Sequence, residues 1–217
     1  MVYVYTVDIT DLPDPLEYPK LMEKLSENRK QKIIECRQRE SRRQSLGAGL
    51  LLREVLKNHG ILEQEIKIGR YGKPETEGIH FNLSHSKNMV VCAVSESMIG
   101  CDIEKISKLP EKVADRFFGE NEIKHLKQIS EEKRSEEFFR LWTMKESYIK
   151  MTGEGLHLPL NRFEMCFSEE GIKVCRDGKI QNCFFKEYNI SDYKLTVCAK
   201  EGEFEEQIWY KKWMNLI

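Results

Sequence analysis

The alternation of apolar and polar residues changes several times along the chain, and each change marks an expected element. Residues 2–9 (V-Y-V-Y-T-V-D-I) alternate with a period of two, which predicts a strand. Asp14-Pro15 predicts a short helix to about residue 25, Ser26 can cap a second helix, and a longer one is expected over 40–58. Strand-like runs follow at 79–84, 89–94 and 98–104, and the short turn between the last two predicts a hairpin.

The second part of the chain also combines helices with strands. Helical patterns cover 112–129 and 135–151, and a β-meander fills the remainder. The strands V-V-C-A-V at 90–94 and L-T-V-C-A-K at 195–200 resemble each other and lie about half the chain apart. We therefore expect an α+β fold of two similar halves, residues 1–105 and 106–217, which pack closely because no long linker separates them.

Composition excludes several classes of protein. The chain has 217 residues, of which 40% are hydrophobic and 33% charged, and its net charge of −1 gives no global attraction to nucleic acid or to a membrane surface. No apolar run approaches membrane-spanning length. Seven scattered cysteines without a C-x-x-C motif favour free thiols in a reducing cytoplasm over disulfides or a zinc site.

Two pairs of charged residues carry the candidate chemistry. Asp102 and Glu104 are two apart on a predicted strand and therefore share a face, while Glu146 and Lys150 are four apart on a predicted helix. Each pair alone has an ordinary explanation, as a solvent-facing strand edge or a surface ion pair. Together the three carboxylates supply only oxygen donors, the ligands that suit Mg²⁺ shared with a phosphate-bearing substrate.

Several residues could hold such a phosphate. The candidates are Lys150, His85, Lys73 and Arg43. Segment 29–43 carries seven basic residues against two acidic ones, and is either a solvated helix face or an edge that faces a phosphate. Ser84 and His85 are adjacent on a predicted strand and point to opposite faces, which argues against a hydrolase dyad.

The motifs then resemble a known family. G-C-D-I-E at 100–104 followed by L-W-T-M-K-E-S-Y-I-K at 141–150 resembles the paired signature of the 4′-phosphopantetheinyl transferases, in their larger Sfp-type form. Four further blocks occur in the family's order: Y-G-K-P (71–74), H-F-N-L-S-H-S (80–86), R-F-F-G-E-N-E (116–122) and G-x-G-L-x-L-P-L (153–160). The resemblance is strong over about 70–160, fair over 26–60 and weak in the final meander.

The resemblance implies a fold and an activity. The fold is a pseudo-twofold monomer with coenzyme A and Mg²⁺ in the cleft between its halves. The activity is transfer of the 4′-phosphopantetheine group from coenzyme A to a serine of an apo acyl or peptidyl carrier protein, releasing 3′,5′-adenosine bisphosphate. The carrier is expected to dock on the second half, near an apolar set of Leu109, Val113, Phe117 and Phe118. The alternative is that this aromatic pair belongs to the core, as most such pairs in helices do.

The resemblance also implies roles for individual residues. Asp102, Glu104 and Glu146 would bind Mg²⁺, Glu146 or a nearby water would take the serine proton, and Lys150 would contact the pyrophosphate and could protonate the leaving group. The residues Arg43, Lys73, Ser84 and His85 would bind coenzyme A, mainly at its adenosine end.

One part of the family pattern is missing. Two family lysines near the 3′-phosphate correspond to Asn28 and Gln31, and the adjacent basic residues Arg29, Lys30 and Lys32 are candidates to replace them. Arg42 is an alternative to Arg43, because a shift of one residue in the alignment exchanges them. Two other functions share the same residues: a metal-dependent nucleotide phosphohydrolase, and a non-catalytic module that binds coenzyme A or a carrier protein.

Overall fold

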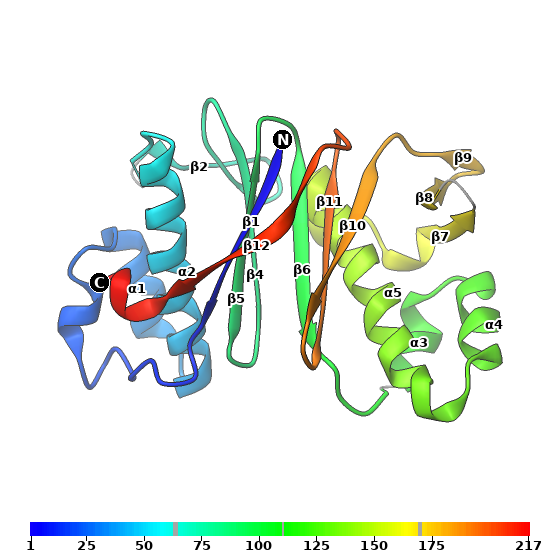
Figure 1. Cartoon of the computed structure of the whole chain (residues 1–217), viewed down its shortest axis with the longest axis horizontal. Helices are drawn as coiled ribbons and strands as arrows, with labels where there is room; N and C mark the ends of the chain where they lie inside the picture. Colours follow the sequence, from blue (N-terminus) through cyan, green and yellow to red (C-terminus); the bar gives the residue numbers. More distant parts are fainter. Residues whose placement is uncertain (63–64, 110, 169–170) are drawn as a thin grey trace.

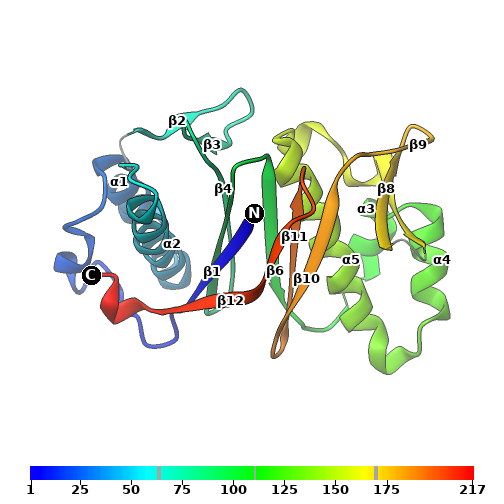
Figure 2. The same cartoon turned by 45° about the horizontal axis from the view of Figure 1, so that its top comes forward.

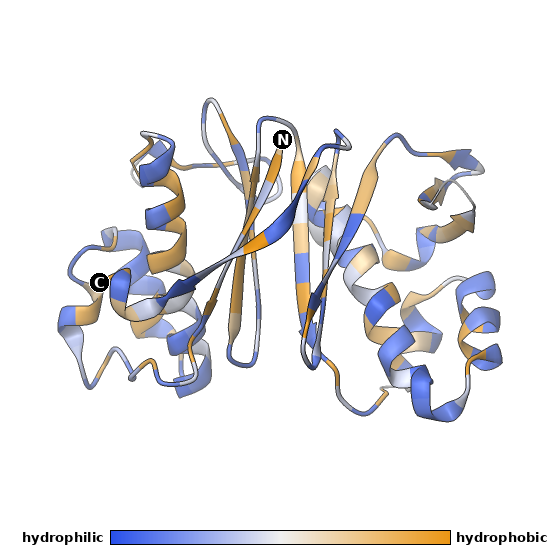
Figure 3. Cartoon of the chain, viewed as in Figure 1, coloured by the Kyte–Doolittle hydropathy of each residue, from blue (hydrophilic) through white to orange (hydrophobic). Residues whose placement is uncertain are grey.

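Two β-sheets lie side by side at the centre of the molecule, each covered on its outer side by helices (Figure 1). The computed structural model describes residues 1–62, 65–109, 111–168 and 171–217. Figure 2 gives the same order of layers from a second direction. Figure 3 shows apolar residues along the inner strands and many hydrophilic residues on the outer helices and the loops. The predicted α+β class is confirmed.

The first sheet has the strand order β12-β1-β5-β4. Its strands are β1 (Val2–Asp8), β4 (His80–Ser86), β5 (Met89–Ser95) and β12 (Phe204–Lys212). Helices α1 (Glu27–Glu35) and α2 (Arg39–Asn58) cover its outer side (Figure 1). The first turn of α1 is capped as predicted, because the Ser26 hydroxyl accepts a hydrogen bond from the backbone N–H of Arg29.

The second sheet has the strand order β10-β11-β6. Its strands are β6 (Ile99–Lys105), β10 (Phe184–Ile190) and β11 (Tyr193–Ala199), and the long helix α5 (Glu131–Thr152) packs against them. The outermost elements on this side are α3 (Glu111–Phe117), α4 (Glu120–Gln128), β7 (Phe163–Ser168), β8 (Gly171–Arg176) and β9 (Lys179–Ile180). Between the helices at either end, a third apolar cluster that includes Val91, Ile103 and Val197 joins the two sheets.

The remaining elements are short. A two-residue pairing joins β2 (Lys67–Ile68) to β3 (Pro74–Glu75), and 3₁₀ turns occupy Pro19–Met22, Gly155–His157, Leu160–Arg162 and Trp213–Asn215. None of the described helices is long and apolar enough to cross a membrane.

Two local predictions are wrong. Residues 14–25 form turns and a 3₁₀ turn instead of an α-helix, because Pro19 lacks a donor and restricts Tyr18, whose φ and ψ are −131° and 71°. The expected hairpin of 89–104 is also absent from the described strands. Strand β5 already pairs with β1 on one edge and with β4 on the other, so β6 passes into the second sheet and pairs with β11.

The division of the chain after residue 105 stays a prediction. Backbone pairing crosses that point twice, since β6 pairs with β11 and β12 pairs with β1. The two similar sequence segments occupy matching places, because β5 and β11 are each an interior strand of their sheet.

Strand β6 and helix α5 approach each other closely at Gly100. A Cβ atom at this position would lie 2.1 Å from the carbonyl oxygen of Ser147 and 2.3 Å from the backbone nitrogen of Met151. Both atoms belong to the helix backbone and cannot rotate away. Glycine at position 100 therefore sets how closely the strand and the helix pack.

A buried ion pair anchors the middle of α5. Lys145 is completely buried, and its Nζ donates to Glu122 Oε1 at 2.8 Å, to Glu122 Oε2 at 2.7 Å and to the Phe163 carbonyl at 2.7 Å. Glu122 also accepts from the backbone N–H groups of Gly119 and Met165. The pair thus ties α5 to the start of α4 and to β7.

We predict that Gly100→Ala destabilises the protein by at least about 3 kcal/mol, because the added methyl group must separate β6 from the backbone of α5. Urea unfolding followed by circular dichroism measures the effect. Gly202→Ala is the matched control, since its Cβ would meet only the ring of the exposed Phe184. Equal unfolding midpoints for the two variants would contradict the prediction.

We predict that Lys145→Met costs about 3–5 kcal/mol of stability, because it leaves the Glu122 carboxylate buried without its cation. Lys133→Met, on an exposed position of the same helix, should change stability by less than about 0.5 kcal/mol. Thermal and urea unfolding of both variants test this difference. A Lys145→Met protein as stable as the Lys133→Met control would show that the pair does not anchor the helix.

Candidate functional site

A cavity of about 310 Å³ opens where β4, β6 and α5 meet. Strand β6 brings the two acidic residues of the G-C-D-I-E motif, and α5 brings Glu146 and Lys150 one helical turn apart. Strand β4 brings Ser84 and His85. The structure thus collects six of the predicted site residues around one cavity: Ser84, His85, Asp102, Glu104, Glu146 and Lys150.

Asp102 is the most buried of the three carboxylates, with 4% of its surface exposed. Its Oδ1 accepts hydrogen bonds from Lys150 Nζ at 2.6 Å and from Ser84 Oγ at 2.8 Å. Its Oδ2 is buried and has no hydrogen-bond partner among the described residues. Because an unpaired buried carboxylate oxygen is costly, this atom indicates a place for a cation or a donor that the chain itself does not provide.

The electrostatics of the cavity indicate a deficit of positive charge. Burial and the negative charge of Asp102 raise the pKa of Glu146 to about 7, and the same two causes raise the pKa of Glu104. Burial alone would lower the pKa of Lys150, but the carboxylates of Asp102 and Glu146 outweigh it and raise that pKa. One lysine therefore faces three carboxylates, and a bound cation would relieve their repulsion.

The three carboxylates do not form a closed metal cage. No group of three or more His, Cys, Asp or Glu side chains in the described parts of the chain is arranged to hold a metal ion. The donor set still fits Mg²⁺ better than a softer metal, because it contains only oxygen and because Mg²⁺ keeps several waters when few protein ligands bind it. The unpartnered Oδ2 of Asp102 is the observation that supports this fit.

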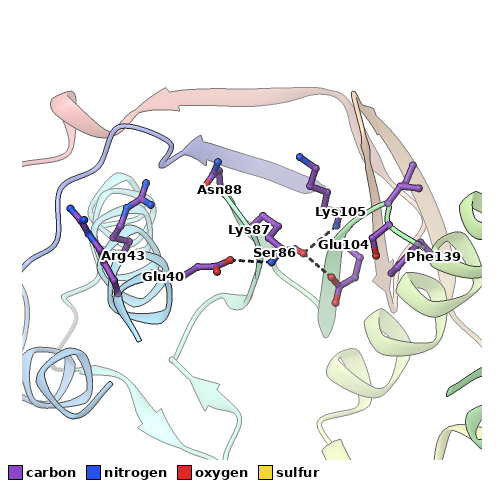
Figure 4. Close-up of a pocket in the computed structure, with 11 residues that line it drawn as sticks. Glu40, Arg43, Ser86, Lys87, Asn88, Glu104, Lys105 and Phe139 are labelled. Atoms are coloured by element: carbon purple, nitrogen blue, oxygen red, sulfur yellow. Dashed lines mark hydrogen bonds and ion pairs between the residues drawn. The ribbon is translucent and has the colours of Figure 1, made fainter. Parts of the chain in front are cut away.

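Arg43 lies outside this cavity. Its guanidinium donates to the carbonyl groups of Ile9, Thr10 and Leu12, and so fastens the turn after β1 to α2. It also lines an adjoining cavity of about 740 Å³ that shares Glu104 with the first (Figure 4). The alternative residue, Arg42, forms an ion pair with the buried Asp14.

Lys73 also lies outside the cavity. Its Nζ donates to the carbonyl groups of Ile99 at 2.9 Å and Met151 at 3.3 Å, and burial lowers its pKa to about 8. It therefore bridges the start of β6 and the end of α5. The predicted contacts of Arg43 and Lys73 with the adenosine end of a ligand stay predictions.

The apolar residues predicted to dock a carrier differ in exposure. Phe118 is buried in the second core with 3% of its surface exposed, so it cannot form part of an accessible surface. Leu109, Val113 and Phe117 are half-buried at the edge of the same core. Phe117 packs edge-on against Trp142, with ring centroids 5.8 Å apart, and Trp142 also lines the cavity.

Sequence reasoning missed Ser86. This residue lines the larger cavity, and its hydroxyl donates to Glu104 Oε2 at 2.7 Å (Figure 4). The alternation N-L-S-H-S carried the signal, because Asn82, Ser84 and Ser86 share one face of β4.

Comparison with known proteins agrees with the motifs. The family model described as the 4′-phosphopantetheinyl transferase superfamily matches residues 98–198. The chain is 34% identical to 4′-phosphopantetheinyl transferase ffp of Bacillus subtilis over 88% of this chain and 89% of that protein. It is 31% identical to 4′-phosphopantetheinyl transferase Sfp of Bacillus subtilis strain 168 over 93% of each chain.

A solved structure matches part of the fold. The holo-(acyl-carrier-protein) synthase of Bacillus anthracis, in complex with coenzyme A (3′,5′-ADP), aligns with 49% of this chain and 97% of its own length, at a TM-score of 0.42 and 19% identity. The sequence relatives, in contrast, match nearly the whole chain. The residues matched by the family model include β6 and α5. The protein is an enzyme, and it belongs to the 4′-phosphopantetheinyl transferase superfamily.

Proposed function

We propose that the protein transfers the 4′-phosphopantetheine group of coenzyme A to a serine of an apo acyl or peptidyl carrier protein, with Mg²⁺ as cofactor. One observation carries this proposal: a single cavity between the two sheets is lined by Asp102, Glu104, Glu146 and Lys150. Family membership supports the transfer itself, because the relatives are named for it.

The reaction exchanges one phosphorus–oxygen bond for another. The carrier serine oxygen forms a bond to the β-phosphorus of coenzyme A, the phosphorus that carries the pantetheine. The bond from that phosphorus to the bridging oxygen of the pyrophosphate breaks, and 3′,5′-adenosine bisphosphate leaves. Glu146 accepts the hydroxyl proton, and Lys150 donates a hydrogen bond or a proton to the departing phosphate. The nucleophile comes from the partner, so this chain has to supply only positioning, charge and proton transfer.

Asp102, Glu104 and Glu146 are the residues that would hold Mg²⁺. The cation, when bound, neutralises the charge that builds on the pyrophosphate. The oxygen-only donor set and the unpartnered Oδ2 of Asp102 support this assignment.

The phosphates of coenzyme A would contact the basic and hydroxyl groups of the cavity. Lys150 and His85 line it and can donate hydrogen bonds, and Ser84 lines it with its proton bonded to Asp102. Lys73 uses two of its three ammonium donors on carbonyl groups, which leaves one for the adenosine end. Arg43 would reach the ligand only from the adjoining cavity. We propose that the cavity residues lie nearest to the phosphates, that Lys73 lies next, and that Arg43 is the most distant of these contacts.

We also propose that the enzyme works as a monomer in the cytoplasm. All seven cysteines lie in the described parts of the chain, and none forms a disulfide. Free thiols suit a reducing compartment.

A panel of apo carrier proteins tests the function. Each carrier is incubated with the enzyme, coenzyme A and Mg²⁺, and mass spectrometry follows addition of phosphopantetheine to the carrier serine. Coenzyme A consumption without any modified carrier would instead identify a phosphohydrolase. Calorimetric binding of coenzyme A without consumption would identify a binding module.

We predict that Asp102→Ala lowers kcat/KM by at least about 100-fold, because it removes the unpartnered oxygen and the partner of Lys150 from the cavity. Transfer to one carrier, measured by mass spectrometry, gives the ratio. Glu201→Ala, at an exposed loop position, should leave the rate unchanged. Activity of Asp102→Ala close to that of the control would refute the assignment of this carboxylate.

We predict that excess EDTA abolishes transfer and that Mg²⁺ in excess of the chelator restores it, because three carboxylates facing one lysine repel a pyrophosphate without a cation. The same mass assay reads the outcome. Undiminished transfer in EDTA would exclude the metal assignment for Asp102, Glu104 and Glu146.

A further inference from the structure

The side chains of β4 bind the free edge of β6. The two strands lie side by side but belong to different sheets, and no backbone pairing joins them in the described structure. Instead, side chains at alternate positions of β4 accept hydrogen bonds from alternate N–H groups of β6. The bonds run from Cys101 N to Asn82 Oδ1 at 2.9 Å, from Ile103 N to Ser84 Oγ at 3.3 Å, and from Lys105 N to Ser86 Oγ at 3.1 Å.

The two hydroxyls in this row also bind the acidic residues of the site. Ser84 Oγ donates to Asp102 Oδ1 at 2.8 Å, and Ser86 Oγ donates to Glu104 Oε2 at 2.7 Å (Figure 4). A serine hydroxyl has a single proton to donate. Because a backbone N–H of β6 already occupies the acceptor side of each oxygen, that proton is directed to the carboxylate.

Each hydroxyl engages one oxygen of its carboxylate. On Asp102, Ser84 and Lys150 share Oδ1, and Oδ2 is the atom without a partner. On Glu104, Ser86 binds Oε2. Glu104 has a longer side chain than Asp102, and the negative charge of Asp102 repels its carboxylate. On its own, this repulsion would turn the Glu104 carboxylate away from the cavity. The hydrogen bond from Ser86 opposes that rotation.

We propose that Ser86 is a positioning residue that holds Glu104 beside Asp102 for a divalent cation, with Ser84 acting in the same way on Asp102. This proposal depends on the proposed function in one respect, because a cation must bind at these carboxylates. Ser86 acts by fixing the direction of Glu104.

Binding of Mn²⁺ in the presence of coenzyme A, without a carrier, tests this role by electron paramagnetic resonance of the free ion. Ser86→Val and Ser86→Thr have the same shape and differ in the hydroxyl. We expect Ser86→Val to weaken Mn²⁺ binding about 10-fold and Ser86→Thr to stay within about threefold of the wild type. Coenzyme A binding without metal, measured by calorimetry, should be the same in all three proteins.

Ser95→Ala is the matched control, since Ser95 is a buried hydroxyl of the neighbouring strand β5 whose bonds to described residues stay within its own turn, to Ser97. It should bind Mn²⁺ as the wild type does. Equal Mn²⁺ affinities of Ser86→Val and Ser86→Thr would overturn the proposal, and so would equal weakening in Ser95→Ala and Ser86→Val.

A double-mutant cycle separates positioning from mere support of β6. If Ser86 acts through Glu104, Ser86→Val should have no further effect on Mn²⁺ affinity in a Glu104→Ala background. A full additional loss there would show that Ser86 acts only by binding the Lys105 N–H, and would overturn the proposal. Wild-type protein that binds Mn²⁺ but modifies no carrier would refute the proposed function while leaving this result intact.

Discussion

The arrangement of the site depends on β6, which follows β5 in the chain but belongs to the second sheet. β5 has a partner on both edges, so β6 cannot pair with it, and β6 instead becomes the edge of the second sheet. Its free edge then faces β4, where Asn82, Ser84 and Ser86 take the place of a backbone partner. The cavity exists because the two sheets meet through side chains at this line.

Because β6 belongs to the second sheet, the charged groups of the cavity lie together in one part of the fold. All three carboxylates and Lys150 lie on β6 and α5, which pack on each other through Gly100. The first sheet contributes Ser84 and His85, and the basic helices lie behind it. The acidic groups thus share one structural unit, whereas the hydroxyl and imidazole groups that face them come from the other.

Much of this could be predicted from the sequence. The spacing of two residues between Asp102 and Glu104 correctly predicted that both lie on one face of a strand. The spacing of four residues between Glu146 and Lys150 did the same for a helix, and the motifs predicted the family. The hairpin of β5 and β6 was predicted wrongly, because local turn signals say nothing about whether a strand edge is already occupied. Arg43 and Lys73 illustrate a second limit. Positive charge identifies candidate phosphate ligands, but their bonds to carbonyl groups depend on long-range packing that no spacing rule reveals.

The contact at Gly100 has a consequence for motion. Because strand and helix backbones touch there, with Lys73 bonded to a carbonyl of each, we expect β6 and α5 to move together as one unit. The backbone positions of Asp102, Glu104 and Glu146 are then set within that unit. Any hinge motion between the sheets would stretch the hydrogen bonds from the β4 serines to Asp102 and Glu104 and would leave the backbone spacing of the three residues unchanged. Such a motion would therefore change the direction of the acidic side chains without changing the backbone that carries them.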